Sequence, residues 1–336
     1  MRPPPDPLLS EIPAFQRARR VPGMVAGLVA RDGSTCWGFG TVAGGSSRVP
    51  DERTIFEIGS VTKVFTAALL ARLAEQGVVA LDEPLRPLLE PEVRLPPWAG
   101  REVTLEHLAT HTSTLPRASR RMMAKALLHP GNPYRDYQVG DLHADLAAFQ
   151  PAPGLGRDFA YSNLGFGLLG HLLSRRAGVP YEDLVVDEVC RPLGLPDTLV
   201  TLDDERRSRL AQGHFFGRPV GLWEIPVLGG AGALRSTAAD MVVFLEANLG
   251  LRRTPLQVAL RTTHEPRVRV SDTFAIGLAW HRTDLPGGGL AVWHRGETGG
   301  MRAFVGFVPE RVLGLVLLAN ASAGVDELGL ELLARL

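Results

Sequence analysis

The sequence predicts an α/β protein of the α+β type, in which an antiparallel sheet built from both termini is flanked by helices and a mainly helical domain is inserted. Strand-like runs occur near the N-terminus and again in the last third of the 336 residues, and helical patterns fill the middle. No internal repeat or low-complexity linker divides the chain. We therefore expect one unit over residues 1–336, with a sheet subdomain at about 1–65 plus 215–336 and a helical subdomain at about 66–214.

The N-terminal region is predicted to form an amphipathic helix followed by a β-hairpin. Apolar side chains recur near helical spacing over residues 8–20. Two apolar runs, 24–30 and 35–42, are then joined by a turn that contains Asp32 and Gly33. Aspartate followed by glycine is typical of tight hairpin turns, so the two runs are expected to pair as antiparallel strands.

The middle of the chain is predicted to be mostly helical. Residues 60–74 form an apolar pattern around most of a helix, which indicates a buried position. Further helices are expected at 164–175 and at 181–190, the second ended by the proline-containing stretch 192–196. A helix at 238–249 follows a Ser-Thr pair that is suited to cap it.

The last third of the chain changes to short strands. Strand-like runs at 274–283, 290–294, 302–308 and 313–319 are separated by turns that contain glycine or proline. This pattern predicts an antiparallel meander. Residues 325–336 are expected to form a closing helix.

Charge and composition exclude several classes of partner. The formal net charge is zero and the pI is about 7.1, so no long-range attraction draws the chain to nucleic acid or an anionic membrane. No apolar stretch is long enough to span a membrane, and the N-terminus lacks the apolar core of a secretory signal. We expect no nucleic-acid or membrane partner and a cytoplasmic location, or an exported protein if a signal had been removed. The oligomeric state stays open.

The chain has two cysteines, Cys36 and Cys190. They are too few and too far apart to predict a metal cluster. Free, buried thiols are the favoured interpretation, although the sequence leaves a disulfide open.

Ser60 and Lys63 are the most informative pair in the sequence. Three residues apart on a helix, a hydroxyl and an amine share one face, where a neutral amine could take the serine proton. Only Lys63 and Lys125 are lysines among 36 Lys and Arg residues. Arginine cannot act as a base, so a lysine at this position in an arginine-rich chain favours catalysis. The alternative is a surface lysine beside a capping serine.

Tyr161 and Asn163 lie two residues apart just before the apolar helix at 164–175. In an extended loop both side chains would project the same way. A tyrosine held as phenolate, or poised near that state by Lys63, could serve as base and acid, and the asparagine amide could hold a substrate carbonyl or amide. The alternative is a turn and a helix cap supplied by Ser162 or Asn163.

Residues 293–300 end a strand-like run and begin a glycine-rich turn that contains His294, Gly296 and Glu297. Glycine there lets the backbone approach a ligand, and exposed N–H groups can serve an oxyanion. The alternative is a hairpin turn that carries an isolated histidine.

Together with residues 56–63, these segments resemble the serine β-lactamase and penicillin-binding-protein superfamily. The closer match is its class C branch, with the D-alanyl-D-alanine carboxypeptidases and family VIII esterases. Stretches at 105–116, 192–195 and 232–240 follow the same pattern, and the resemblance covers most of residues 20–320. It implies a β-lactamase/transpeptidase-like fold, a small-molecule acyl substrate and no cofactor or metal.

The resemblance also implies roles for four residues. Ser60 would attack the acyl carbonyl, and Lys63 would contact Ser60 and share the proton with Tyr161. Asn163 would hold the amide of the substrate's acyl side chain and help to fix Lys63.

The strand at 290–294 is expected to supply further substrate contacts. By resemblance, the backbone N–H groups of Ser60 and Glu297 would form the oxyanion hole. His294, with Gly296 two residues later, takes the place of a lysine that meets the substrate carboxylate. A neutral histidine would do this poorly, so β-lactam acylation is expected to rise as the pH falls from about 7.5 to 6. Arg295 could substitute only if its side chain does not point away.

The leading prediction is a serine hydrolase, a carboxylesterase or β-lactamase-type amidohydrolase, that acts through an acyl-enzyme on an ester or amide. A β-lactamase, a D-Ala-D-Ala carboxypeptidase or D-aminopeptidase, and an acyltransferase stay open. A non-catalytic binding protein is disfavoured because Ser60, Lys63 and Tyr161 are all present.

Other features are interpreted as structural or left without a role. The segment 118–141 is expected to form the rim of the pocket and to select the substrate. Thr114 stands where relatives have glycine, which puts that loop in question if the position needs a positive φ. Residues interpreted as structural are His107, His111, Trp223, Trp280 and Trp293.

Overall fold

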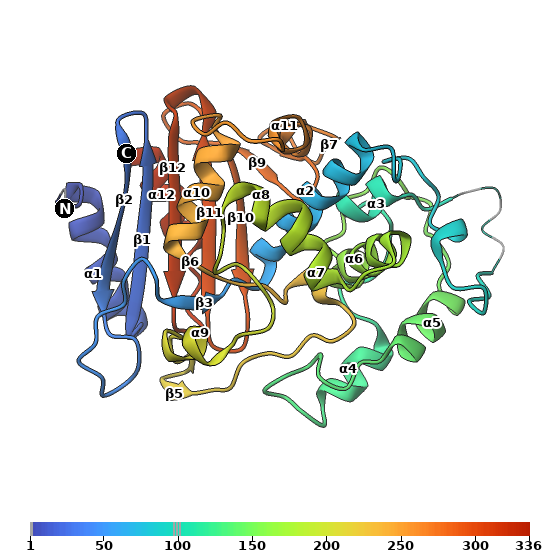
Figure 1. Ribbon diagram of the computed structural model, residues 1–336, viewed down its shortest axis with the longest axis horizontal. Coiled ribbons are helices and arrows are strands. Elements are labelled where there is room, and N and C mark those ends of the chain that lie inside the picture. Colours follow the sequence, from blue (N-terminus) through green and yellow to red (C-terminus); the bar gives the residue numbers. More distant parts are fainter. Residues whose placement is uncertain (1–2, 97, 99, 101) are drawn as a thin grey trace.

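Eight antiparallel strands form the main sheet, and both ends of the chain contribute to it (Figure 1). In the computed structural model, which describes residues 3–96, 98, 100 and 102–336, the strand order is β2-β1-β12-β11-β10-β9-β8-β7. The strands are β1 (Gly23–Ala30), β2 (Gly33–Gly40), β7 (Val268–Arg269), β8 (Phe274–Ile276), β9 (His281–Asp284), β10 (Leu290–Glu297), β11 (Arg302–Val308) and β12 (Leu313–Ala319).

The two ends of the chain meet where β1 pairs with β12. Met24 lies opposite Ala319 and Val29 lies opposite Gly314, so the N-terminal hairpin continues the C-terminal meander as one sheet. This pairing confirms the predicted sheet from both termini, and the tight turn between β1 and β2 confirms the predicted hairpin.

Helices cover both faces of the sheet, and alternate side chains of β1 pack into the hydrophobic core on each face. Met24 and Ala26 belong to the core under α1 and α12, whereas Val25 and Val29 belong to the core shared with α10. Because successive strand residues face opposite sides, an all-apolar strand such as β1 requires cover on both faces. The covering helices are α1 (Asp6–Arg19), α10 (Ala238–Asn248) and α12 (Asp326–Arg335).

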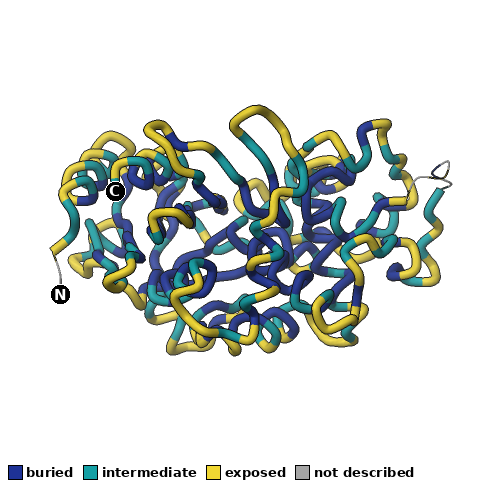
Figure 2. Tube along the Cα trace, turned by 90° about the horizontal axis from the view of Figure 1, so that it is seen from above, coloured by how far each residue is buried: buried dark blue, intermediate teal, exposed yellow. Residues whose placement is uncertain are grey.

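The helix α2 (Thr62–Glu75) runs through the centre of the molecule, between the sheet and the other helices (Figures 1 and 2). Every residue from Thr62 to Ala71 is buried, which confirms the predicted buried helix. The remaining helices of the middle region lie mostly on the far side of α2. They are α3 (Leu105–Ala109), α4 (Arg120–Ala126), α5 (Val139–Ala147), α6 (Asn163–Ala177), α7 (Tyr181–Val185), α9 (Asp204–Ser208) and α11 (Gln257–His264).

Two short strands that the sequence did not predict pair at the centre of the molecule. β3 (Ile55–Glu57) pairs with β6 (Arg235–Thr237), with Phe56 opposite Ser236. A further pair, β4 (His214–Phe215) and β5 (Arg218–Pro219), forms a small hairpin at the surface. The β3–β6 pair brings the segment before Ser60 beside the segment at 229–234, which are far apart in the chain.

The structure corrects three element boundaries. The helix expected from residue 60 begins as a 3₁₀ turn over Gly59–Val61 and becomes α-helical at Thr62. The strand expected at 274–283 is two strands, because the chain bends at Ala279, which has a φ of 64°. The helix expected to end at residue 190 widens to a π-helix over Val186–Cys190 and continues to Leu193. Proline 192 has no N–H to donate, which accounts for the widened turn before it.

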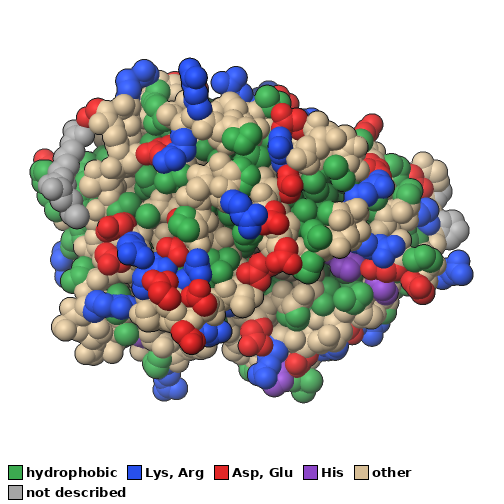
Figure 3. Space-filling model, in the orientation of Figure 1, with side chains coloured by type: hydrophobic (Ala, Val, Ile, Leu, Met, Phe, Trp, Pro, Cys, Tyr) green, Lys and Arg blue, Asp and Glu red, His purple; other side chains and the backbone are tan. Residues whose placement is uncertain are grey.

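Surface features agree with the neutral composition. On the face shown in Figure 3, acidic and basic side chains are interspersed without a large area of one sign. Among the described residues, no helix combines the length and hydrophobicity needed to cross a membrane. Cys190 is buried and Cys36 partly buried, and both are free thiols.

Candidate active site

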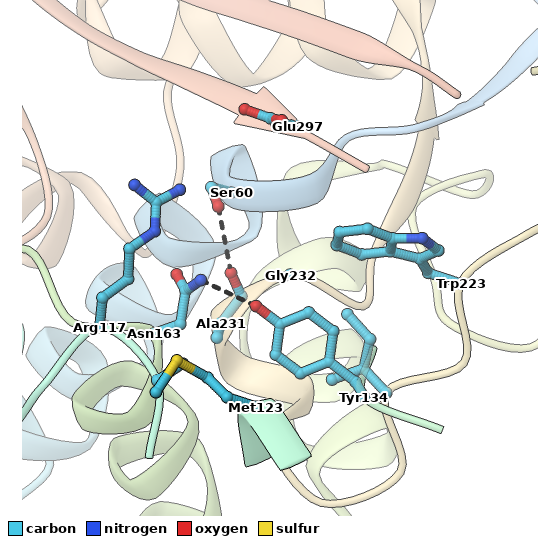
Figure 4. A pocket seen from close by; sticks show the side chains of 11 residues that line it. Ser60, Arg117, Met123, Tyr134, Asn163, Trp223, Ala231, Gly232 and Glu297 are labelled. Carbon is cyan, nitrogen blue, oxygen red and sulfur yellow. Dashed lines mark hydrogen bonds between the residues drawn. The ribbon is translucent and has the colours of Figure 1, made fainter. Parts of the chain in front are cut away.

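Ser60 lies on the 3₁₀ turn between β3 and α2. The preceding Gly59 has a φ of 55°, a left-handed conformation that glycine adopts without steric cost. The turn places Ser60, partly buried, at the start of the central helix. A short strand that leads into a tight turn and a helix thus presents the hydroxyl toward the cavity described below (Figure 4).

Lys63 is completely buried, and its amine has three close partners. Nζ lies 2.9 Å from Ser60 Oγ, 3.0 Å from Asn163 Oδ1 and 2.6 Å from the carbonyl oxygen of Ala231. Among the described residues, no carboxylate forms an ion pair with Lys63. Burial lowers the pKa of Lys63 well below its ordinary value, and the positive charge of Arg117 lowers it further.

An ammonium at Lys63 would donate to all three oxygens, that of Ser60 included. After loss of one proton, two N–H groups serve the carbonyl oxygens of Asn163 and Ala231, and the lone pair can accept from the Ser60 hydroxyl. Burial, not the set of partners, favours the uncharged amine. The competing contact from Ser60 Oγ to the Ala231 oxygen is 3.5 Å long, at the limit for a hydrogen bond.

Tyr161 lies beside this pair but does not fit the predicted phenolate. Burial raises the pKa of Tyr161 to about 12, while a hydrogen bond with Ser60 and the charge of Arg117 act in the opposite direction. Lys63 Nζ lies 5.0 Å from the centre of the Tyr161 ring. The raised pKa favours the protonated phenol over the phenolate, and the part that Tyr161 plays as base and acid stays a prediction.

His111 fixes the loop that carries Tyr161. Its Nδ1 accepts a hydrogen bond from the Ser162 N–H at 3.0 Å, and its carbonyl oxygen accepts from the Ala160 N–H at 2.8 Å. The His111 and Tyr161 rings are 4.4 Å apart. His107 Nδ1 accepts from the Thr104 N–H at 3.2 Å at the start of α3. Both histidines are therefore engaged in hydrogen bonds with the backbone, as their structural interpretation requires.

Asn163 connects Lys63 to the wall of the pocket. It is the first residue of α6, which Ser162 caps by accepting from the Gly165 N–H at 2.8 Å. The cap predicted as the alternative interpretation is thus present together with the contact to Lys63. Asn163 Nδ2 donates to the hydroxyl of Tyr134 at 2.8 Å, so the amide is oriented at both ends.

The backbone nitrogens of Ser60 and Glu297 converge where β10 passes the 3₁₀ turn. A Cβ atom on Gly59 would lie 2.5 Å from the Glu297 nitrogen, and one on Gly296 would lie 3.0 Å from the Ser60 nitrogen and 1.8 Å from the Ile58 oxygen. Only glycine permits this approach. Two N–H groups from different elements can therefore face one acyl oxygen beside the Ser60 hydroxyl.

A cavity of about 320 Å³ opens beside Ser60 (Figure 4). Its walls come from five regions: the 3₁₀ turn of Ser60, the stretch after α3, the start of α6, the loop before β6 and the end of β10. The lining residues are Ser60, Arg117, Ala118, Met123, Tyr134, Asn163, Trp223, Ile225, Ala231, Gly232 and Glu297. Such a mainly apolar cavity with a few convergent polar groups is typical of a small-molecule site.

A sequence profile of the Beta-lactamase family matches residues 9–336, almost the whole chain. The chain belongs to the Beta-lactamase family. It is 28% identical over 316 residues to the D-alanyl-D-alanine-carboxypeptidase/endopeptidase AmpH of Escherichia coli (strain K12), which covers 88% of this chain and 80% of that protein. It is 31% identical over 340 residues to Putative beta-lactamase-like 1 of Homo sapiens, with 96% and 65% coverage.

Solved structures of β-lactamases share the fold of this family member. A class C beta-lactamase superposes with a TM-score of 0.85 at 24% identity and covers 98% of this chain and 94% of its own. The Beta-Lactamase/D-Alanine Carboxypeptidase from Pseudomonas syringae gives a TM-score of 0.82 at 23% identity, with 94% of each chain covered. The predicted superfamily, the β-lactamase/transpeptidase-like fold and the serine hydrolase class are therefore confirmed.

In this β-lactamase-family protein, His294 does not contribute to the pocket as predicted. Its side chain is fully buried, Nδ1 lies 2.6 Å from the Arg295 carbonyl oxygen, and Nε2 has no partner among the described residues. Burial lowers the pKa of His294 well below its ordinary value, and the neighbouring bases His281 and Lys63, which compete for a proton, lower it further. The expected imidazolium near pH 6 is therefore wrong, because a buried ring that faces other bases stays neutral.

Of the three residues that follow His294 on β10, Gly296 differs from expectation, whereas Arg295 and Glu297 do not. Gly296 is buried against the 3₁₀ turn and serves the close approach of β10 to Ser60, without lining the cavity. Glu297 does line it, and its carboxylate accepts from Arg302 at 2.8 Å. Arg295 points away and bonds Asp326 at 2.6 Å, so it does not replace the absent lysine.

Sequence reasoning did not identify several residues of the cavity. Trp223, interpreted as core, lines the cavity and donates through Nε1 to the Gly131 oxygen at 2.8 Å, whereas Trp280 and Trp293 are buried as interpreted. Tyr134 belongs to the segment 118–141 that was expected to form the rim. Arg117 directly follows the family-like stretch at 105–116, which was the one signal that could have revealed it.

The loop at Thr114 tolerates threonine in a conformation that favours glycine. Thr114 has a φ of 60°, so this position does take the positive φ that glycine favours. Its Oγ1 accepts a hydrogen bond from the Ala152 N–H at 3.0 Å, which glycine could not do. That bond offsets the cost of the left-handed backbone.

Proposed function

We propose that this serine hydrolase transfers an acyl group to Ser60, releases it to water, and acts on small, uncharged esters better than on β-lactams. The observation that carries the proposal is the buried Lys63, whose amine contacts Ser60 Oγ at 2.9 Å while two carbonyl oxygens take its N–H groups. A desolvated, uncharged lysine is a competent base for a serine hydroxyl.

The geometry supports the following sequence of steps. Lys63 accepts the Ser60 proton as Oγ attacks the acyl carbonyl, and the carbonyl electron pair moves onto the oxygen. The N–H groups of Ser60 and Glu297 stabilise that oxyanion. Tyr161 donates its proton to the leaving alkoxide and recovers one from the Lys63 ammonium. Water then attacks the acyl-enzyme with Lys63 again as base, and Ser60 leaves with the returned proton.

The preference for esters rests on the side chains that β10 presents near the cavity. β10, where the resemblance implies a lysine, supplies only the buried, neutral His294, and Arg295 is paired with Asp326. A β-lactam carboxylate therefore meets no cation from this strand, whereas a neutral ester needs none. Small-molecule substrates also fit a cavity of about 320 Å³.

Hydrolysis of p-nitrophenyl butyrate and nitrocefin by the parent and by variants tests this function. The parent should turn over the ester faster than nitrocefin, and intact mass spectrometry should show the acyl group on Ser60. Ser60→Ala should lose nearly all activity. Lys63→Arg should lose about 10²–10⁴-fold, because arginine keeps the charge but cannot accept a proton.

Lys125→Arg is the matched control, since Lys125 is the other lysine of the chain and pairs with Asp141 in the rim segment. It should keep the activity of the parent. An active Lys63→Arg enzyme would remove Lys63 as the base. Nitrocefin turnover above ester turnover at neutral pH would refute the substrate preference and restore a β-lactamase.

A peptidase that releases a C-terminal residue is the second candidate. Arg117 lines the cavity, is exposed, and belongs to none of the ion pairs between described residues, so its guanidinium is available to a substrate carboxylate. The relative AmpH carries the name of a D-alanyl-D-alanine carboxypeptidase. Release of D-alanine from a D-Ala-D-Ala peptide, and its loss in Arg117→Gln, would favour this activity over the esterase.

A further inference from the structure

Glu90, His143 and His171 bring three metal-binding side chains together outside the cavity. Glu90 Oε2 lies 3.2 Å from His143 Nε2, and Glu90 Oε1 lies 2.8 Å from His171 Nε2. One ligand atom from each residue lies within 4.8 Å of the other two. None of the three lines the cavity beside Ser60.

The three residues come from separate parts of the chain, and the fold holds each in place. His143 is on α5, His171 is on α6, and Glu90 follows the short 3₁₀ turn at Arg86–Leu88. The loop before Glu90 is tied to α6, because Arg175 Nε donates to the Leu88 oxygen at 2.9 Å and Nη2 donates to the Leu89 oxygen at 3.1 Å. The ligands are therefore positioned before any ion arrives.

Two of the ligand atoms lack the hydrogen bonds that burial demands. Glu90 Oε2 and His143 Nε2 are both inaccessible to solvent and have no hydrogen-bond partner among the described residues, although they lie 3.2 Å apart. Buried polar atoms without a partner are costly and uncommon. A metal ion that bonds both atoms would satisfy them, and ligands of a tetrahedral zinc ion lie about 3.3 Å apart.

We propose that Glu90, His143 and His171 bind one divalent transition-metal ion, with zinc the best fit. Two imidazoles and one carboxylate form a known zinc ligand set, with the fourth position left to water. Magnesium and calcium fit less well, since they prefer oxygen ligands. Arg175 Nη1 lies 3.9 Å from Glu90 Oε1 and competes weakly for the carboxylate.

A bound ion would connect the rim of the cavity to the helix that carries Asn163. α5 is linked to α4 by the pair of Lys125 with Asp141, and α4 contributes Met123 to the cavity wall. α6 begins at Asn163, which contacts Lys63. The ion would fasten α5 to α6 and so hold the rim segment without touching the reacting atoms.

Metal content and thermal stability of the full-length protein test the site. After incubation with zinc and dialysis against metal-free buffer, the parent should retain about one zinc ion per chain. Its melting temperature should rise with added zinc and fall back with EDTA, because an ion that binds only the folded state stabilises it. Cobalt in the same site should give the visible absorption of a tetrahedral complex.

His143→Asn and His171→Asn should retain less than about a tenth of the parent's zinc and show no zinc-dependent rise in melting temperature. His129→Asn is the matched control, since His129 Nε2 also lies 3.0 Å from a carboxylate, that of Asp136, but has no third ligand among the described residues. It should bind zinc like the parent.

Clear outcomes would overturn the proposal. These are zinc retention far below one ion per chain in the parent, equal zinc in the parent and His143→Asn, or a melting temperature that depends on pH but not on zinc. Should His171→Asn fail to fold, His143→Asn and the EDTA titration of the parent still decide. Hydrolytic activity is not the readout, so the result is independent of the proposed function.

Discussion

At the scale of single residues, the protonation state of Lys63 determines whether Ser60 is reactive. The amine is buried without a carboxylate partner among the described ion pairs, so the ammonium form is disfavoured. Arg117 adds to this effect from the cavity wall. The exposed Arg117 stays hydrated and charged, whereas the buried lysine gives up its proton, which is the arrangement that general-base chemistry needs.

Arg117→Gln should move the acidic limb of the kcat/KM pH profile to higher pH. The Arg117 charge lowers the pKa of Lys63. Its removal therefore raises that pKa, and Lys63 becomes protonated, and inactive, at a higher pH than in the parent. Because Arg117 is exposed and screened, the shift should become smaller at high salt.

Arg121→Gln is the control for this shift, since Arg121 lies four residues further along the chain, in the rim segment, but is paired with Asp145 at 3.5 Å. Its profile should coincide with that of the parent. A limb that stays in place or moves to lower pH in Arg117→Gln would show that Arg117 does not act on Lys63. The position of the limb is informative even if Arg117→Gln also weakens substrate binding.

At the scale of elements, the 3₁₀ turn and the end of β10 must touch for the site to exist. Gly59→Ala should therefore lower kcat by about 10²–10³-fold, the loss expected when one oxyanion donor is displaced. The new Cβ would lie 2.5 Å from the Glu297 nitrogen and 2.6 Å from its oxygen, so β10 must shift. The φ of 55° adds a stability cost of about 1 kcal/mol.

Gly77→Ala separates the two effects. Gly77 also has a positive φ, 73°, but a Cβ there would meet nothing within 4 Å. Gly77→Ala should lose only the stability that its φ costs, about 1 kcal/mol in urea unfolding, and keep its kcat. If Gly59→Ala were as active as Gly77→Ala, the close approach of β10 would not matter for catalysis.

Local patterns in the sequence predict what a single element determines. Ser60 and Lys63 share a helix face because they are three residues apart, and the caps at Ser162 and Thr237 follow from residue type. Contacts between distant loops leave no such pattern. Lys63 bonds the backbone carbonyl oxygen of Ala231, a group that every residue type carries, so residue type does not reveal it. Trp223 reaches the cavity only because its loop lies beside the rim.

His294 shows why a correct family assignment did not give the correct role. The residue occupies the expected place on β10, but its charge depends on what packs around it. Its ring faces His281 and Tyr161, with ring centres 4.9 Å and 6.3 Å away. These neighbours come from β9 and from the loop before α6, and no spacing within the sequence specifies that they meet.

At the scale of the whole molecule, the fold buries several histidines in their neutral form. The pKa of His264 and of His281 is lowered to about 3, and those of His111 and His294 lie well below the ordinary value, in each case mainly by burial. Unfolding exposes these rings to water, where they bind protons below about pH 6.5. The folded state instead binds extra protons at two buried carboxyls, Asp240, whose pKa is raised to about 6, and Glu57.

The balance of these groups predicts that the protein loses stability as the pH falls from about 7 to 5. In this range the unfolded chain gains protons on these four histidines and on His107, whose pKa burial also lowers, and the folded chain gains them on two carboxyls. The unfolded state thus binds more protons, and stability rises with pH.

The urea midpoint should therefore decrease on acidification. His264→Asn should make this decrease shallower by up to about 1.4 kcal/mol per pH unit, and His129→Asn, on the surface, should not. A midpoint that is constant or rises toward pH 5 would show that the buried histidines do not control the acid stability of this fold.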